Sequence, residues 1–160
     1  MFDVTLDGDW AKTKKMLTQM PHFIETLKRR LVSEVSHRYY DSLRYHFQQQ
    51  DLNLEPLSEW YSQWKSKRGL DSRILIATSQ MLDAIQIHDD GHDKFVGIKS
   101  GKRHRSGIDI ALLALVHEYG SAARGIPTRS VYRITLQELR AELDGVVQLI
   151  IDDVAKDVFG

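Results

Sequence analysis

The densest group of side chains that could bind a metal ion lies in one short acidic stretch. It comprises His88, Asp89, Asp90, His92 and Asp93. Imidazole nitrogens and carboxylate oxygens are ligands that zinc and calcium take in proteins. The spacing matches neither a calcium-binding loop nor a helical pair of zinc ligands, and Asp and Gly are residues that tight turns prefer. The sequence therefore favours a plain turn, and we expect no metal site.

A second candidate for chemistry is His117, which Glu118 follows directly at the end of an apolar helical pattern. Neighbouring residues on a helix point about 100° apart, so these side chains do not converge on one substrate. The helix dipole, which favours a positive charge at the C-terminus, also explains a histidine there. The sequence contains no nucleophile elbow, phosphate-binding loop or dinucleotide fingerprint. We therefore expect no catalytic residues and no cofactor, and predict that the protein is not an enzyme.

The one concentrated basic patch is the loop 99–107. Its cationic and histidine side chains are Lys99, Lys102, Arg103, His104 and Arg105. A loop with glycines and no apolar anchor is expected to be mobile and solvated. Flexible cations suit phosphate contacts, but no aromatic residue interleaves with them, which argues against base stacking. We expect the loop to face either passing DNA or a protein partner.

Composition sets the broad class. The chain has 160 residues, of which 42% are hydrophobic and 28% charged, as is typical of one soluble globular domain. Its 22 basic and 22 acidic residues give a formal charge of zero, which weakly favours self-association over general binding to nucleic acid or membrane. The absence of cysteine excludes disulfides and thiolate chemistry. Without a signal-peptide pattern or a bilayer-length apolar run, we expect a soluble intracellular product.

The N-terminal half is expected to form a short strand and helices. Alternation over 2–6 predicts a half-buried strand, and Asp9 is a candidate N-cap for a helix through Met20. Pro21 suits the first turn of a second, long amphipathic helix that ends near 48–50.

A short helix with an aromatic face is expected to follow and to stop near Gly69. Its face carries Leu57, Trp60, Tyr61 and Trp64. Two tryptophans one turn apart are costly to expose, so this helix should pack on the core or on a neighbouring subunit.

A hairpin is expected next in the chain. Residues 81–88 and 94–99 predict two strands, with the acidic turn between them. A helix over 108–119 should end at Gly120 in a left-handed cap.

The last expected element is a long terminal helix. Thr135 with Glu138 predicts a capping box at its start, and the helix should run to about Val158. The expected fold is one α+β domain over residues 1–160. In it, a small antiparallel sheet is packed by several helices, with long helices near both ends of the sequence.

Two separated segments carry a resemblance to a known family. The first contains Pro56-Leu57-Ser58, Tyr61, Trp64-Lys65, Lys67-Arg68-Gly69, Ile74-Leu75, Thr78-Ser79, Met81-Leu82 and Ala84-Ile85, and the second contains His117-Glu118-Tyr119-Gly120 and Ile126-Pro127-Thr128-Arg129. Together, covering roughly half the chain, they resemble the tail-completion and virion-morphogenesis proteins of tailed phages, including the Mu-like family and the related neck or head–tail connector proteins. The sequence departs from that pattern at Ser79, Ala84 and Ser130-Val131.

The resemblance implies a structural virion protein of the neck or upper tail, made in the host cytoplasm. Its copies would form a ring around the DNA channel, between the head connector or adaptor and the tail tube or terminator proteins. Such a ring would touch passing DNA without reading its sequence and would need no membrane.

Six residues are predicted to serve structure and assembly: Trp60, Trp64, Tyr119, Gly120, Pro127 and Arg129. A side chain at Gly120 would strain the positive φ angle expected there. Pro127 should fix the approach of Arg129, which should bind backbone carbonyls or a carboxylate before the last helix. Two rival functions stay open: a DNA-binding or packaging accessory protein that acts through the loop 99–107, and a small hydrolase with a site at residues 88–93.

Overall fold

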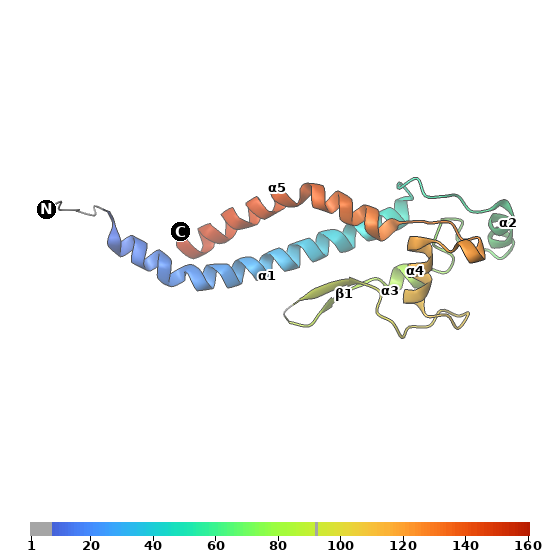
Figure 1. Cartoon of the computed structure of the whole chain (residues 1–160), viewed down its shortest axis with the longest axis horizontal. Coiled ribbons are helices and arrows are strands. Elements are labelled where there is room, and N and C mark those ends of the chain that lie inside the picture. The colour runs from blue at the N-terminus through green and yellow to red at the C-terminus, as the bar shows by residue number, and fades with distance from the viewer. Residues whose placement is uncertain (1–7, 92) are drawn as a thin grey trace. The chain divides into compact units, whose positions relative to one another are not determined.

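The fold is α+β, and its first and last elements are long helices, as the sequence predicts (Figure 1). The computed structural model describes residues 8–91 and 93–160. Their elements are α1 (Trp10–Gln49), α2 (Glu59–Lys67), α3 (Gln80–Ala84), β1 (Gln86–Asp89), β2 (Lys94–Gly97), α4 (Ile110–Tyr119), the 3₁₀ helix η1 (Ala122–Arg124) and α5 (Val131–Phe159). None of the helices in the described part of the chain has a segment long and apolar enough to cross a membrane.

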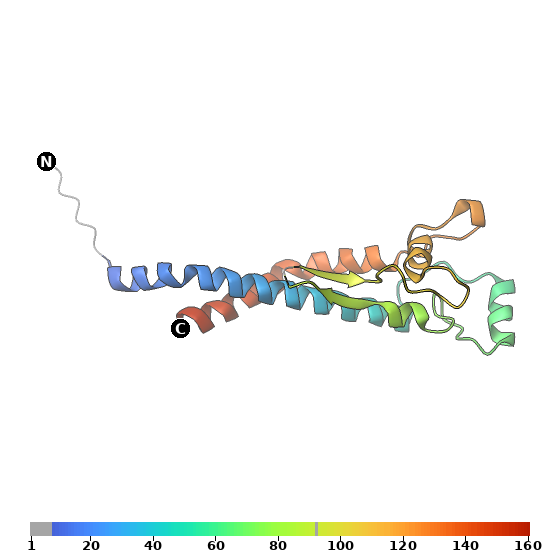
Figure 2. The same ribbon diagram turned by 90° about the horizontal axis from the view of Figure 1, so that it is seen from below.

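The described residues group into two compact units, and both long helices run through both units. One unit contains residues 8–32, most of them in α1, and residues 143–160; the C-terminal turns of α5 run beside α1 in both ribbon views (Figures 1 and 2). The ring centroids of Phe23 and Phe159 lie 5.2 Å apart. Arg30 donates from Nη1 to Asp153 at 2.7 Å and from Nη2 to Asp157.

The other unit, residues 33–142, contains the main hydrophobic core. Its buried members come from α1, α3, α4, the start of α5 and the segments between them: Leu43, Phe47, Ile76, Met81, Leu82, Ala84, Ile85, Ile98, Ile110, Ala114 and Val131. Packing against this core stabilises the short helix α3 and the two-stranded hairpin, because elements of this length are not stable by themselves in water.

The sheet is a single antiparallel hairpin. β1 and β2 pair in the register Gln86↔Gly97 to Asp89↔Lys94. The turn is closed by its own acidic side chains: Asp89 accepts from the amide of Gly91 at 2.9 Å, and Asp90 accepts from the amide of Asp93 at 2.8 Å. The predicted hairpin is thus confirmed, although β1 includes Asp89, which was expected in the turn, and β2 ends at Gly97, two residues before the expected end.

The boundary expected at Pro21 is wrong, because α1 runs unbroken through it. A proline inside a helix leaves the carbonyl four residues earlier without its usual donor. That carbonyl belongs to Leu17, and both residues are exposed, so water can take the place of the missing amide. At the helix start, Asp9 accepts from the amide of Lys12 at 3.0 Å, as expected of an N-cap. The strand predicted over 2–6 lies outside the described residues.

Residues 81–84 were expected in a strand but form most of the short helix α3. The buried positions Met81, Leu82, Ala84 and Ile85 are spaced as on one side of a helix, not in alternation. Ser79, with φ +57°, turns the chain immediately before this helix.

The capping box expected at Thr135 and Glu138 is also wrong, since α5 already begins at Val131. The Thr135 hydroxyl is buried and donates to the carbonyl of Val131 at 2.7 Å. Glu138 instead lies 2.9 Å from Nε2 of His46, whose Nδ1 lies 2.7 Å from Asp51. The helix starts early because the Glu118 carboxylate accepts from the amides of Tyr132 and Arg133 in its first turn.

Candidate functional site

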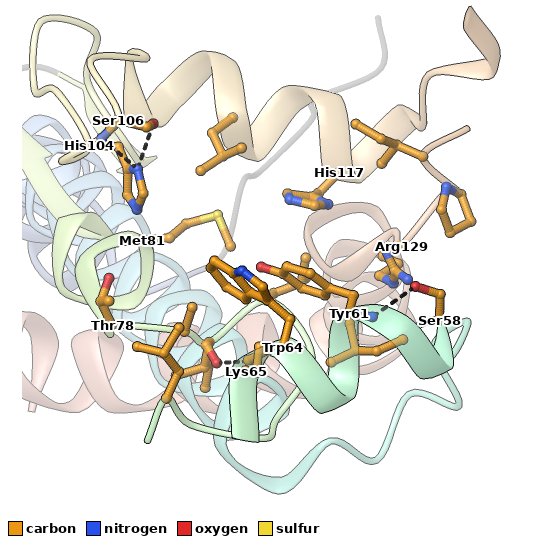
Figure 3. Close-up of a pocket in the computed structure, with 18 of the residues that line it drawn as sticks. Ser58, Tyr61, Trp64, Lys65, Thr78, Met81, His104, Ser106, His117 and Arg129 are labelled. Atoms are coloured by element: carbon orange, nitrogen blue, oxygen red, sulfur yellow. Dashed lines mark hydrogen bonds between the residues drawn. The ribbon is translucent and has the colours of Figure 1, made fainter. Parts of the chain in front are cut away.

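A groove with a volume of about 920 Å³ is lined by residues of α2, α3, α4, η1 and the segments that flank them (Figure 3). The rings of Tyr61 and Trp64 project into it from α2, towards Met81 of α3 and His117 of α4. Its volume is at the upper end of the range for small-ligand pockets. The groove is therefore large enough to receive several side chains.

The aromatic wall of the groove follows from the spacing of α2. The Ser58 side chain caps this helix by accepting from the amide of Tyr61. The ring of Tyr61 stacks with that of Trp64 at 5.4 Å between centroids, and the guanidinium of Arg68 lies 4.3 Å from the Trp64 centroid. Trp60 remains 72% exposed. The sequence predicts that this helix packs either on the core or on a neighbouring subunit. The core of the same chain leaves Trp60 uncovered.

Lys65 fixes α2 against the segment that precedes α3. Its ammonium is buried and donates to the carbonyls of Arg73 at 2.7 Å and Ile76 at 2.8 Å. Burial lowers the pKa of Lys65, and the nearby Asp71 carboxylate acts in the opposite direction. Because the ammonium is bound to both carbonyls, Lys65 holds α2 and the segment before α3 together along the groove.

Arg129 makes the kind of contact expected of an anchor. Its side chain is buried, and it donates from Nε to the carbonyl of Glu55 at 2.8 Å and from Nη2 to the carbonyl of Pro56 at 3.1 Å. Its backbone amide donates to the carbonyl of His117 at 2.7 Å. This one residue therefore joins the end of α4, the loop before α2 and the start of α5.

Glu118 supplies the cap of α5 that no local sequence signal shows. Its buried carboxylate accepts from the amides of Tyr132 at 3.0 Å and Arg133 at 2.9 Å. The first amides of a helix have no partner within it and attract negative charge. The backbone carbonyl of Glu118 also accepts from the Ser130 hydroxyl at 2.9 Å. Glu118 is thus committed to structure.

Gly120 allows the tight turn after α4. Its φ is +74° and its ψ is 176°, so φ is positive as expected although ψ lies outside the left-handed helical region. A Cβ at this position would lie 2.9 Å from Oγ1 of Thr128 and 3.0 Å from the carbonyl oxygen of Ile126. Glycine is therefore required by both conformation and space.

The side chains of His117 and Glu118 point to different places, as the angle between neighbouring helix positions indicates. Its ring lines the groove, while the Glu118 carboxylate binds the start of α5. Burial, and to a lesser extent the nearby Arg129 guanidinium, lowers the pKa of His117, in the direction opposite to the one that the helix dipole favours.

The basic loop is solvated, as expected, but it is tied by hydrogen bonds and is not the free loop that its composition indicates. The amide of His104 donates to the carbonyl of Ile108, and that of Ile110 donates to Lys102, both within 3 Å. Asp109 accepts from the amide of Gly101 at 2.6 Å, a bond that lowers the pKa of its carboxyl group. Lys99, the first residue of this loop, is exposed.

The structure separates the predicted site residues into two sets. Those that line the groove are Trp60, Trp64, His104, Arg105, Pro127 and Arg129, whereas Lys99, Lys102, Arg103, Tyr119 and Gly120 lie outside its lining. At the acidic turn, hydrogen bonds to Gly91 and Lys94 lower the pKa of Asp89. Among the residues that the structure describes, which omit His92, no three potential ligands are grouped to hold a metal ion.

Replacing Glu118 by alanine should lower the free energy of unfolding by about 3 kcal/mol, since two part-buried amides lose a charged acceptor. Glu118→Gln keeps an acceptor oxygen for one of the two amides, but its NH2 group cannot accept from the other, so it should lose about 2 kcal/mol. The exposed Glu142→Ala serves as the control, with a change below about 0.5 kcal/mol. Urea denaturation measures all three. Equal losses in Glu118→Ala and Glu142→Ala would contradict the capping role.

The two glycines of the turn region provide a matched test. Gly120→Ala should cost at least about 2 kcal/mol of unfolding free energy, because strain and a close contact add together. Gly125, with φ +60° and no atom near its missing Cβ, should lose only about 1 kcal/mol on the same change. Thermal and urea unfolding of both variants check the difference; a larger loss at Gly125 would refute it.

Comparison with known proteins gives one distant likeness. An uncharacterized protein of Methanocaldococcus jannaschii is 29% identical to the chain over 142 residues, which cover 89% of this chain and 93% of that protein. No protein-family model matches the chain. No solved structure matches it either. The chain is therefore similar over most of its length to one protein whose description assigns it no activity.

Proposed function

We propose that the protein is an assembly subunit, a tail-completion or neck protein that forms a ring around the DNA channel of a tailed phage. The observation that carries this proposal is the state of the junction between α4 and α5. Glu118 is bound to two backbone amides and Arg129 to two carbonyls. Because these groups are occupied, the junction that carries the resemblance to the family supports a structural role better than a catalytic one.

An exposed apolar row on α4 supports a role in assembly. Leu112, Leu115 and Tyr119 are 53%, 54% and 65% exposed, and Ile108, just before the helix, is also exposed. Residues spaced by three and four positions share one side of a helix. An apolar row of this kind favours burial against another protein.

The groove and the α4 row are different surfaces of the same helix. Leu113 and His117 of α4 line the groove, whereas Leu112, Leu115 and Tyr119 face solvent. A ring requires each subunit to use two different faces, one for each neighbour. The proposed neighbours are further copies of the chain, the head connector or adaptor, and the tail tube or terminator proteins.

Imaging of purified particles tests this proposal. The expected result is density for this chain in the neck or upper tail, with copies related by rotation around the channel, because heterologous contacts close into rings. Mass spectrometry of the same particles provides the independent check. Particles that lack the chain would contradict the proposal.

A DNA-binding accessory role is the second candidate, and the exposure of the basic loop favours it. Lys102, Arg103 and Arg105 are exposed, and no carboxylate of the described residues forms an ion pair with them within 4 Å.

In that role the protein should bind duplex DNA with an affinity that falls steeply with salt, since each phosphate contact releases counterions. Replacing Lys102, Arg103 and Arg105 together by glutamine should abolish the binding. Titration of labelled duplex at several salt concentrations measures it, with Lys12→Gln/Lys14→Gln/Lys15→Gln on α1, where all three lysines are exposed, as the charge-matched control. Binding that survives the loop replacement would rule out this role.

A further inference from the structure

We infer that the groove binds an acidic, apolar peptide segment, and that its occupant is residues 2–7 of a second copy of the chain. This inference rests on the self-assembly proposed above and names the contact through which one copy holds the next.

The groove offers a firm apolar surface. Tyr61 and Trp64 stack on one another, and Met81 and Leu113 also line the groove. Lys65 and Arg129 are hydrogen-bonded to backbone carbonyls, which fixes α2 and the segment before α5 in place. Preorganised aromatic pockets of this kind bind apolar side chains with little loss of conformational freedom.

The charge of the lining selects an acidic partner. Lys65, Arg105, Arg124 and Arg129 line the groove, whereas among the described lining residues Glu55 is the only acidic one. Burial and Arg129 lower the pKa of His117, which disfavours its charged form. Arg105 and Arg124 are exposed, so they can meet carboxylates at the groove edge.

Residues 2–7 have the complementary chemistry. Phe2, Val4 and Leu6 alternate with polar residues that include Asp3, and Asp7 follows, without any basic side chain in the segment. In an extended conformation, such alternation places the apolar side chains on one face. An aromatic and two aliphatic side chains could then fill the groove while the carboxylates approach Arg105 and Arg124.

The other acidic, apolar end of the chain is already occupied. Phe159 packs on Phe23, and Asp157 accepts a hydrogen bond from Arg30, so residues 157–160 are held within the helical unit. The second copy is chosen as donor because a segment given by one subunit to a different surface of the next is a heterologous contact, which a ring requires.

A charge-exchange experiment on the full chain tests the inference. The first variant, Asp3→Lys/Asp7→Lys, carries a basic segment and an unchanged groove. The second, Arg105→Glu/Arg124→Glu, carries an acidic groove and an unchanged segment. A fluorescent peptide of residues 1–9 should bind the groove of the first variant. When Arg105→Glu/Arg124→Glu is added to that variant, the peptide should bind at least about tenfold more weakly, because two ion pairs become repulsive. A peptide with lysines at positions 3 and 7 should show the opposite preference.

Two controls separate this contact from general electrostatics. Lys99→Glu/Lys102→Glu, outside the groove, should leave peptide affinity unchanged, and Phe2→Ala in the peptide should weaken binding in the unmodified groove. Light scattering of the two full-length variants should show association when they are mixed, but not when each is alone. Three results would overturn the inference. They are association of either variant alone, association only when both charge exchanges are made in the same chain, and equal binding of the two peptides.

The outcomes also separate this inference from the proposed function. Particles that contain the chain as a ring, together with a groove that ignores the peptide, would remove only the inferred contact. Peptide binding with no chain in the particles would instead remove the phage role and leave the groove as a peptide-binding site.

Discussion

The unit of residues 33–142 depends on one contact, in which the Glu118 carboxylate accepts from the first amides of α5. A long helix that starts in the interior leaves amides that need acceptors, and burial makes an unpaired amide expensive. Glu118 meets this need from the end of α4, and Arg129 completes the junction by binding the loop before α2. Three elements thereby become one rigid support for the groove and for the exposed face of α4.

The same junction explains which parts of the fold the sequence reveals. Hydrophobic periodicity and turn residues indicate the hairpin, the end of α1 and the helix before Gly120, because these are local properties. Glu118 caps a helix that begins after an intervening loop, so nothing in its own neighbourhood marks it as a cap. The early start of α5, in place of the one expected near Thr135, follows from that distant contact.

The candidate site was visible from sequence only in part. The aromatic residues of α2 and the Pro127–Arg129 segment were identified as structural, but their union in a groove with Met81 and His117 depends on tertiary packing. Lys65 was missed because a lysine in an amphipathic helix is ordinarily solvated. Here its buried amine binds two carbonyls of a segment whose fold the sequence leaves open.

We propose that the junction is a preformed support and that the surfaces around it become covered when the subunit assembles. Hydrogen exchange, compared between the free protein and the protein in the proposed phage particles, tests this proposal most directly. The amides of Arg129, Tyr132 and Arg133 should be protected in both states, whereas those of α2 and α4 should gain protection only in particles. Rapid exchange of the three junction amides in the free protein, or no gain at α2 and α4 on assembly, would contradict the account.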